Sequence, residues 1–364
     1  MKLRISLVVV SCLVSIITGL VLARGGSGKA SSAREKQRPL IGLSMDTLKE
    51  ERWQGDRDMF KKRAAELGAE VIDLSANSSD AQQVKDVEAL ISRGVDALVV
   101  IPHDGTAMAK AVELAHRSGI PVLAYDRLIT NCDLDLYMTF DNVKVGELQA
   151  KFLADRFASG GKKRIVRIYG SKTDNNALLF KQGQDNVIEP LIKSGAVEVV
   201  HEDWTQDWKP ENAKKIANAA ITKAVASGQP QGALPFDAIL ASNDGTAGGA
   251  IQALTEEGLA GKILVTGQDA ELAACQRIVA GTQAMTIYKP LRELANKAAE
   301  QAVKLAQRRP TIARGELDNG KIKVPSIFLD VISVTKENMD ETVVKDGFHK
   351  REAIYQGTPP SRSF

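Results

Sequence analysis

The chain has 364 residues, of which 44% are hydrophobic and 26% are charged. These are ordinary values for a globular protein, and they exclude a largely disordered chain and a polytopic membrane protein. The formal net charge of +3 excludes a protein that holds nucleic acid by charge alone, and three cysteines are too few for a disulfide-built scaffold.

The amino terminus has the pattern of an export signal. Two basic residues precede an uncharged apolar run over residues 5–22, and small residues follow it. We expect a signal peptide over residues 1–23, cleaved after Ala23, and then a flexible Gly- and Ser-rich tether over residues 24–38. An uncleaved anchor and lipid attachment at Cys12 stay open. Each alternative places the folded part in the periplasm or another extracytoplasmic space.

Strands and helices alternate from residue 39 onward. Short β-branched runs predict strands, and amphipathic stretches that end at glycine predict helices. The predicted strands span residues 40–45, 70–75, 97–101, 122–125, 164–169, 238–241, 263–267 and 284–288. The predicted helices include residues 54–67, 81–93, 106–118 and 291–307. This βαβα order implies right-handed crossovers and parallel sheets. Two such series predict an α/β chain with two lobes of doubly wound parallel sheet.

Polar side chains and tryptophans follow most of the predicted strands. In an open parallel sheet, ligands bind beyond the carboxyl ends of the strands. The candidate site residues at these positions are Arg52, Trp53, Asp126, Arg127, Asp174, Asn176, Trp208, Asn243, Asp269 and Lys289. Carboxylates accept hydrogen bonds, Arg and Lys donate them, and Asn does both. The set suits an uncharged polyhydroxylated ligand, since each hydroxyl both donates and accepts, and an indole suits the C–H face of a sugar ring.

Each of these residues also has a simpler structural explanation. Strand-end Asp and Asn often cap the next helix, and of the pair Asn243 and Asp244 we expect Asp244 to be the cap. Arg127 could form a surface ion pair, and Trp53 or Trp204 could belong to the core of a lobe. The prediction of a site therefore depends on several such residues meeting at one sheet edge.

An ordered set of segments resembles the periplasmic sugar-binding proteins of the ribose/galactose type, and among them the D-xylose-binding members of bacterial ABC importers. The likeness is carried by residues 51–54, 123–127, 140–147, 174–177, 208–213, 241–254, 267–270, 288–290 and 345–350. It covers nearly the whole chain after the signal. The chain departs from the family pattern by an insertion at residues 227–235, which we expect to change only a surface loop.

The resemblance implies a type I periplasmic binding protein, with two lobes joined by a three-strand hinge. The crossings are expected near residues 140–141, just after Lys289 and near residues 323–329. The implied domains are an N-terminal lobe of residues 39–140 plus 290–323, a C-terminal lobe of residues 141–289 plus 324–350, and a tail of residues 351–364.

The resemblance also assigns roles to the candidate residues. Trp53 and Trp208 would hold the sugar ring between them, which leaves Trp204 as the structural tryptophan. The implied partners are D-xylose or a similar pentose, and an ABC permease with its ATPase. A chemoreceptor or sensor kinase is the alternative partner, which can coexist with transport. No cofactor, metal or nucleic acid is expected, and the protein is expected to be a monomer.

Three other functions compete with this one: a sugar-sensing binding protein for a chemoreceptor or histidine kinase, a glycosidase, and a sugar-responsive repressor. A glycosidase could use a pair of carboxylates from Asp126, Asp174 and Asp269. No nucleophile, metal or phosphate motif supports catalysis, so we assign no catalytic residue and expect no enzyme. A sugar-responsive repressor would need a helix-turn-helix where the export signal lies. Cys132 and Cys275 are expected on different lobes and not joined by a disulfide.

Overall fold

The computed structural model describes residues 38–157, 160–228 and 233–356. The predicted signal peptide, nearly all of the tether and the last residues of the tail lie outside them. The described residues from Pro39 onward form one compact unit. Across the described ranges, we find no helix with the length and apolar character needed to cross a membrane.

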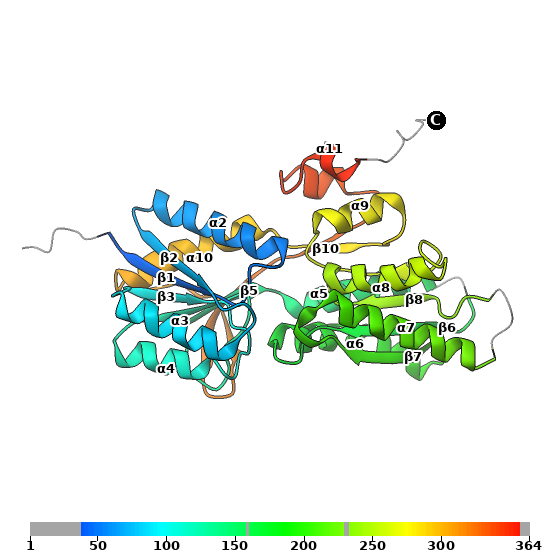
Figure 1. Cartoon of the computed structure of the whole chain (residues 1–364), viewed down its shortest axis with the longest axis horizontal. Coiled ribbons are helices and arrows are strands. Elements are labelled where there is room, and N and C mark those ends of the chain that lie inside the picture. The colour runs from blue at the N-terminus through cyan, green and yellow to red at the C-terminus, as the bar shows by residue number, and fades with distance from the viewer. Residues whose placement is uncertain (1–37, 158–159, 229–232, 357–364) are drawn as a thin grey trace, which may run out of the picture. The chain divides into compact units, whose positions relative to one another are not determined.

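The first lobe is built on a seven-stranded sheet (Figure 1). Its strands are β1 (Leu40–Met45), β2 (Glu70–Ser75), β3 (Ala97–Val100), β4 (Val122–Tyr125), β5 (Leu136–Phe140), β11 (Gly315–Asp318) and β12 (Lys323–Leu329). They lie in the order β11-β12-β5-β4-β3-β1-β2, and all neighbouring pairs are parallel except β11 with β12. Strands β3 and β4 are buried along their whole length, as expected for a sheet covered on both faces.

Helices cover both faces of this sheet. Helix α2 (Glu51–Glu66) packs against α10 (Leu291–Ala306), and α3 (Asp80–Ser92) packs against α4 (Ala109–Arg117). Each pair closes its own apolar core against the strands, one containing Phe60 and Leu294 and the other containing Leu90 and Val112. The predicted helix over residues 291–307 therefore covers the first lobe.

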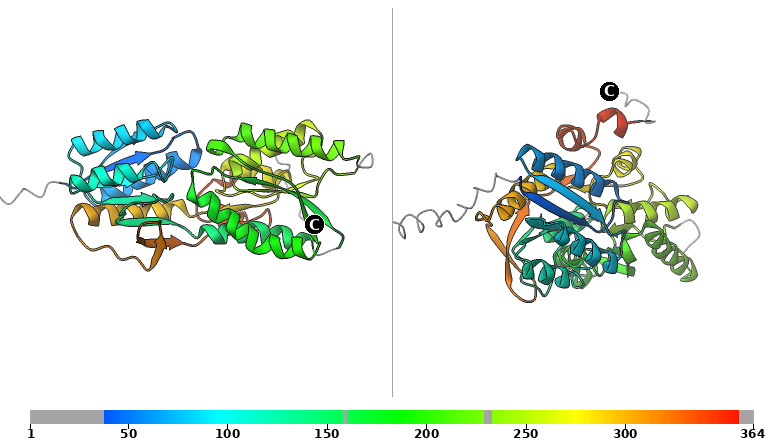
Figure 2. Two further views of the ribbon diagram at one scale, coloured as in Figure 1. Left: turned by 90° about the horizontal axis from the view of Figure 1, so that it is seen from below. Right: turned by 60° about the vertical axis from the view of Figure 1, so that its left-hand side comes forward.

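The second lobe repeats this plan with a smaller sheet. Its strands are β6 (Lys163–Tyr169), β7 (Val197–Trp204), β8 (Ala238–Ala241) and β9 (Leu264–Val265), in the parallel order β7-β6-β8-β9. Helices α5 (Asn142–Phe157) and α6 (Asn175–Lys193) pack together, as do α7 (Pro210–Ala226) and α8 (Asp244–Glu256). They belong to two separate cores of this sheet, and Figure 2 shows helices on both sides of it.

The remaining elements form a small cluster attached to the second lobe. Strands β10 (Thr286–Tyr288) and β13 (Ile332–Val334) pair antiparallel. Around them lie α9 (Leu272–Ala280), the π-helix η2 (Asp340–Val344) and α11 (Arg351–Ile354), which share a buried apolar core. The short 3-10 helix η1 (Gln206–Trp208) connects β7 to α7.

Both lobes order their first four strands alike, as β2-β1-β3-β4 and β7-β6-β8-β9, which is a doubly wound arrangement. The chain passes between the lobes three times: after β5, after β10 and after β12. Asp141 N donates to Leu329 O at 3.0 Å and so joins the first crossing to the third. The predicted fold class, two doubly wound lobes with a three-strand hinge, is confirmed.

One predicted boundary lies too early in the chain. Residues from 324 onward were assigned to the second lobe, but Ser326 to Leu329 of β12 pair with β5 in the first sheet. The strand therefore belongs to the first lobe up to Leu329, because its backbone hydrogen bonds are made there.

Candidate functional site

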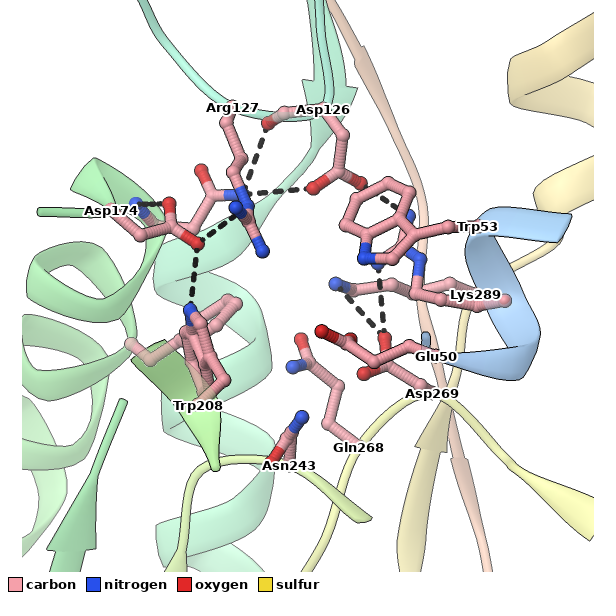
Figure 3. Close-up of a pocket in the computed structure, with 13 residues that line it drawn as sticks. Glu50, Trp53, Asp126, Arg127, Asp174, Trp208, Asn243, Gln268, Asp269 and Lys289 are labelled. Carbon is pink, nitrogen blue, oxygen red and sulfur yellow. Dashed lines mark hydrogen bonds and ion pairs between the residues drawn. The ribbon is translucent and has the colours of Figure 1, made fainter. Parts of the chain in front are cut away.

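All ten predicted site residues line one pocket of about 280 Å³ (Figure 3). The first lobe supplies Arg52, Trp53, Asp126 and Arg127, and the second supplies Asp174, Asn176, Trp208, Asn243 and Asp269. Lys289 comes from the second crossing, directly after β10. The space is small, and side chains from both lobes surround it. The pocket therefore suits a small ligand.

Three of the ten residues have an unusual backbone. Asp126, Trp208 and Asp269 have φ angles of 63°, 57° and 97°, in the left-handed region that non-glycine residues rarely occupy. In Asp126 and Asp269 this turn comes just after β4 and β9, at the carboxyl ends of the two sheets. Such strained residues concentrate at functional sites, where the surrounding structure holds them in place.

Arg127 links the two lobes through carboxylates on either side. Its Nη1 lies 2.8 Å from Asp46 Oδ2 in the first lobe, and its Nε lies 3.0 Å from Asp174 Oδ2 in the second. Trp208 Nε1 donates to the same Asp174 oxygen at 3.2 Å. Burial raises the pKa of Asp174, and the Arg127 guanidinium offsets this only in part. Arg127 is buried, so it is not the surface ion pair that the sequence left open.

Arg52 makes a second link between the lobes. Its Nη2 donates to Asp126 Oδ2 at 2.7 Å, and its Nη1 donates to Asp269 Oδ1 at 3.2 Å. Lys289 Nζ approaches the same Asp269 oxygen at 3.4 Å. Burial alone would raise the pKa of Asp126, but Arg52 and Lys289 outweigh it and lower that pKa. Asp126 is therefore held ionised.

Buried residues behind the pocket hold these arginines. Asp56 Oδ2 lies 3.6 Å from Arg52 Nε, and Tyr125 donates its hydroxyl to the other Asp56 oxygen. Burial raises the pKa of Asp56 to about 6, although Arg52 opposes the shift. Beside Arg127, His103 Nδ1 lies 3.0 Å from Asp46 Oδ1, and this contact raises the pKa of His103.

The two asparagines differ in how much of their amide is already used. Asn176 Nδ2 donates across the lobes to Asp126 Oδ1 at 3.0 Å, and its Oδ1 accepts from Asn142 at 2.8 Å. Asn243 Oδ1 accepts from Thr246 N at 2.9 Å and so caps α8. Figure 3 shows the Asn243 amide nitrogen directed into the pocket. Asn243 thus caps a helix and still presents a donor.

The predicted cap at Asp244 is wrong. Asp244 is the first residue of α8, and Asn243 before it has the extended backbone of a cap residue. The buried Asp244 carboxylate instead accepts from Gln283 at 2.7 Å, from Thr286 at 2.9 Å and from the backbone of Glu271 at 3.0 Å. It therefore ties α8 to the neighbouring loops.

Trp53 and Trp208 face the pocket from different lobes (Figure 3). Trp53 also packs in the core of the first lobe, and its Nε1 is buried without a hydrogen bond to any described residue. Trp208 packs against Gly170, where an added Cβ would lie 2.0 Å from its Cη2. Trp204 packs on Tyr169 at 4.8 Å between ring centroids, away from the pocket lining, and is the structural tryptophan.

Three pocket residues were missed from the sequence: Glu50, Phe180 and Gln268. Gln268 directly precedes Asp269 at the same strand end, and Glu50 lies two residues before Arg52, so adjacency could have indicated both. Phe180 lies one helical turn after Asn176 on α6, a spacing that places both side chains on one face.

The pocket lining combines charged side chains with aromatic rings. All its acids and bases except Glu50 pair with one another, and two indoles provide flat apolar walls. In the part of the chain that the structure describes, no group of three His, Cys, Asp or Glu residues could hold a metal ion. Cys132 and Cys275 are buried and not joined to each other.

The model of the periplasmic binding protein domain matches residues 41–310. The chain belongs to this family. Among its relatives is a D-xylose-binding periplasmic protein from Haemophilus influenzae, 48% identical over 90% of this chain and 95% of its own length. One of the same description from Escherichia coli is 47% identical over 94% of this chain and 98% of its own length.

Solved structures agree with this family membership. A carbohydrate transporter solute-binding protein from Chloroflexus aurantiacus, in complex with D-glucose, superposes with a TM-score of 0.79 at 34% identity. The match covers 87% of this chain and 98% of that protein. The resemblance to periplasmic sugar-binding proteins, predicted from the sequence, is confirmed.

Proposed function

We propose that this protein captures D-xylose in the pocket between its lobes and delivers it to an ABC permease whose ATPase drives import. The observation that carries the proposal is the pocket itself. It is small, enclosed by both lobes, walled by two indoles and lined by paired acids and bases. The high identity to D-xylose-binding proteins over nearly the full length supports this choice of sugar.

In the proposed complex, Trp53 and Trp208 contact the two faces of the pyranose ring. The sugar hydroxyls take hydrogen bonds from Arg52, Arg127, Lys289 and the amide of Asn243, and the carboxylates accept from them. A hydrogen bond to a charged group contributes roughly 1.5–3 kcal/mol. Several such bonds, less the cost of association, give about −8 kcal/mol, which corresponds to a micromolar Kd.

Binding would favour the closed form of the two lobes. The contacts of Arg52 with Asp269 and of Arg127 with Asp174 cross between the lobes, so they form only when the lobes meet. A sugar that touches both lobes adds contacts in the closed form alone and shifts the population toward it. The closed form is the one we expect to dock on the permease.

We also infer that the protein binds without chemical change and acts outside the cytoplasm. Each pocket carboxylate but Glu50 is engaged with a buried cation, which leaves no pair arranged as general acid and nucleophile. After incubation with the protein, D-xylose should be recovered unchanged, and formation of a new product would contradict this.

A thermal-shift panel of pentoses and hexoses tests the ligand. At about 100 times its Kd a ligand stabilises the fold by about 2.7 kcal/mol, so D-xylose should raise Tm clearly. D-Glucose should raise it less, because a hydroxymethyl group at C5 needs room between the indoles. Equal shifts for both sugars would refute the pentose preference, and no shift with any pentose would refute the proposed function.

A further inference from the structure

Glu50 lies in the pocket without a partner of its own. It directly precedes α2 at the cap position, yet its side chain makes no capping hydrogen bond. The side chain is partly buried and lines the pocket, and Figure 3 shows its carboxyl directed inward. Among the described residues, its carboxyl has no hydrogen bond or ion pair.

The cations of the pocket are already engaged with other carboxylates. Arg52 pairs with Asp126 and Asp269, and Lys289 pairs with Asp269 at 3.4 Å. Arg127 pairs with Asp46 and Asp174, and among the described residues no ion pair joins it to Glu50. The pocket lining thus holds four carboxyl groups against three cations.

Within the described part of the chain, a second polar group of the pocket lining without a partner is the side-chain oxygen of Gln268. Gln268 is 2% exposed, and its Nε2 donates to Ser242 O at 3.2 Å. Its Oε1 is buried with no hydrogen-bond partner among the described residues. A buried polar atom without a partner costs roughly 1–3 kcal/mol, so this oxygen indicates where a ligand hydroxyl or an acid proton would be stabilised.

We propose that Glu50 is a further sugar-contacting residue, and that sugar binding transfers a proton from solvent to its carboxyl group. This inference rests on the proposed function. Closing the lobes brings Glu50 of the first lobe to a wall that already carries Asp269 and Glu271 of the second. An uncharged sugar brings no cation to offset the added negative charge, whereas a proton removes it.

The charged groups that face Glu50, together with its burial, raise its pKa, which is the direction that uptake of a proton requires. They are Asp46, Arg52 and Arg127 from the first lobe, Asp269 and Glu271 from the second, and Lys289 from the second crossing. Burial raises the pKa of Glu50, Arg127 opposes the shift, and Asp269 adds to it. At the pocket mouth Lys209 is held by Asp207 at 2.8 Å, and among the described residues neither Lys209 nor Lys49 forms an ion pair with Glu50.

The expected pH dependence follows from this. If the carboxyl gains a proton on binding, affinity is highest at low pH and falls as pH rises through its pKa in the bound form. The steepest slope for one proton is about tenfold in affinity per pH unit. A neutral glutamine in its place should bind without this slope.

Calorimetric titration with D-xylose tests the proposal, in phosphate and in Tris at the same pH. The difference between the binding heats in the two buffers gives the number of protons taken up per sugar bound, and we expect at most about one. Glu50→Gln should abolish the uptake, and Glu211→Gln, at an exposed carboxyl of the pocket mouth, should retain it. Glu50→Ala should bind roughly two- to tenfold more weakly than Glu50→Gln, because it loses the contact as well.

The possible failures are distinguishable. Binding of D-xylose with no proton uptake, or with equal uptake in Glu50→Gln, overturns the role of Glu50 and leaves the proposed function standing. Absence of binding by the unaltered protein and by Glu211→Gln alike overturns both. Equal affinity of Glu50→Ala and Glu50→Gln overturns the contact.

Discussion

Replacement of Asp174 by asparagine separates two roles of one side chain. Asp174 Oδ1 accepts from Asn176 N at 2.9 Å and caps α6. Asp174 Oδ2 faces the first lobe, with Arg127 Nε at 3.0 Å and Trp208 Nε1 at 3.2 Å. Asparagine keeps an oxygen for the cap but places its amide NH2, which donates and cannot accept, on the side of Arg127.

The expected loss of D-xylose affinity in Asp174→Asn depends on the contacts that Arg127 retains. It retains Asp46 at 2.8 Å, so it does not become an unpaired buried charge, a change that costs about 3–5 kcal/mol. The change removes the charged acceptor that Arg127 Nε and Trp208 Nε1 share, and a hydrogen bond to a charged group contributes about 1.5–3 kcal/mol. Because the contact crosses the lobes, we expect it to appear as a roughly ten- to hundredfold weaker affinity for D-xylose.

Calorimetry and chemical denaturation check the two roles separately. Asp174→Asn should weaken D-xylose binding and leave the free energy of unfolding nearly unchanged. Asp174→Ala should also lose about 1 kcal/mol of stability with the cap. Asp185→Asn, on the same helix and paired with Arg167 outside the pocket, should bind like the unaltered protein. An affinity of Asp174→Asn within twofold of the unaltered protein would refute the reasoning.

Three further changes probe other parts of the site. Gly170→Ala places a Cβ 2.0 Å from the Trp208 ring, so the ring must shift. Because such overpacking costs about 1–3 kcal/mol, calorimetry should show at least a several-fold loss of D-xylose affinity. His103→Asn tests how much the contact between His103 and Asp46 adds to the free energy of unfolding. This contact raises the pKa of His103 in the folded protein. The stabilisation is therefore fully present below the ordinary histidine pKa of about 6.5, and it is lost as pH rises through the raised pKa of the folded protein. Chemical denaturation over a pH series should show that loss in the unaltered protein but not in the variant, and identical profiles would contradict it. Asp269→Ala leaves two buried cations without this carboxylate, so affinity should fall by about a hundredfold or more, and an unchanged Kd would remove Asp269 from the site.

The sequence predicted the location of the site because parallel strands end at a common edge. Residues after β1, β4, β6, β8 and β9 meet in the pocket although they are far apart in the chain. This inference needed only the strand pattern and the polar residues that follow it. Strand β7 was missed because it is partly exposed and carries charged residues, so it lacks the apolar run that predicts a buried strand.

The pairings within the pocket could not be predicted in the same way. Arg52 and Asp269 are 217 residues apart, and their contact depends on how closely the lobes approach. The choice between Asn243 and Asp244 as helix cap depends on which backbone is extended, and two adjacent polar residues give no signal for this. Adjacency to Arg52 could have indicated that Glu50 lies in the pocket. That its carboxyl has no ion pair among the described residues could not be predicted, because this depends on how the other charged side chains pair.

A crystal structure of the protein with D-xylose tests the central claim most directly. We expect the pyranose ring between Trp53 and Trp208, with its hydroxyls within hydrogen-bond distance of the acids and bases that line the pocket. A sugar bound outside this pocket, or a ring that touches neither indole, would contradict the account.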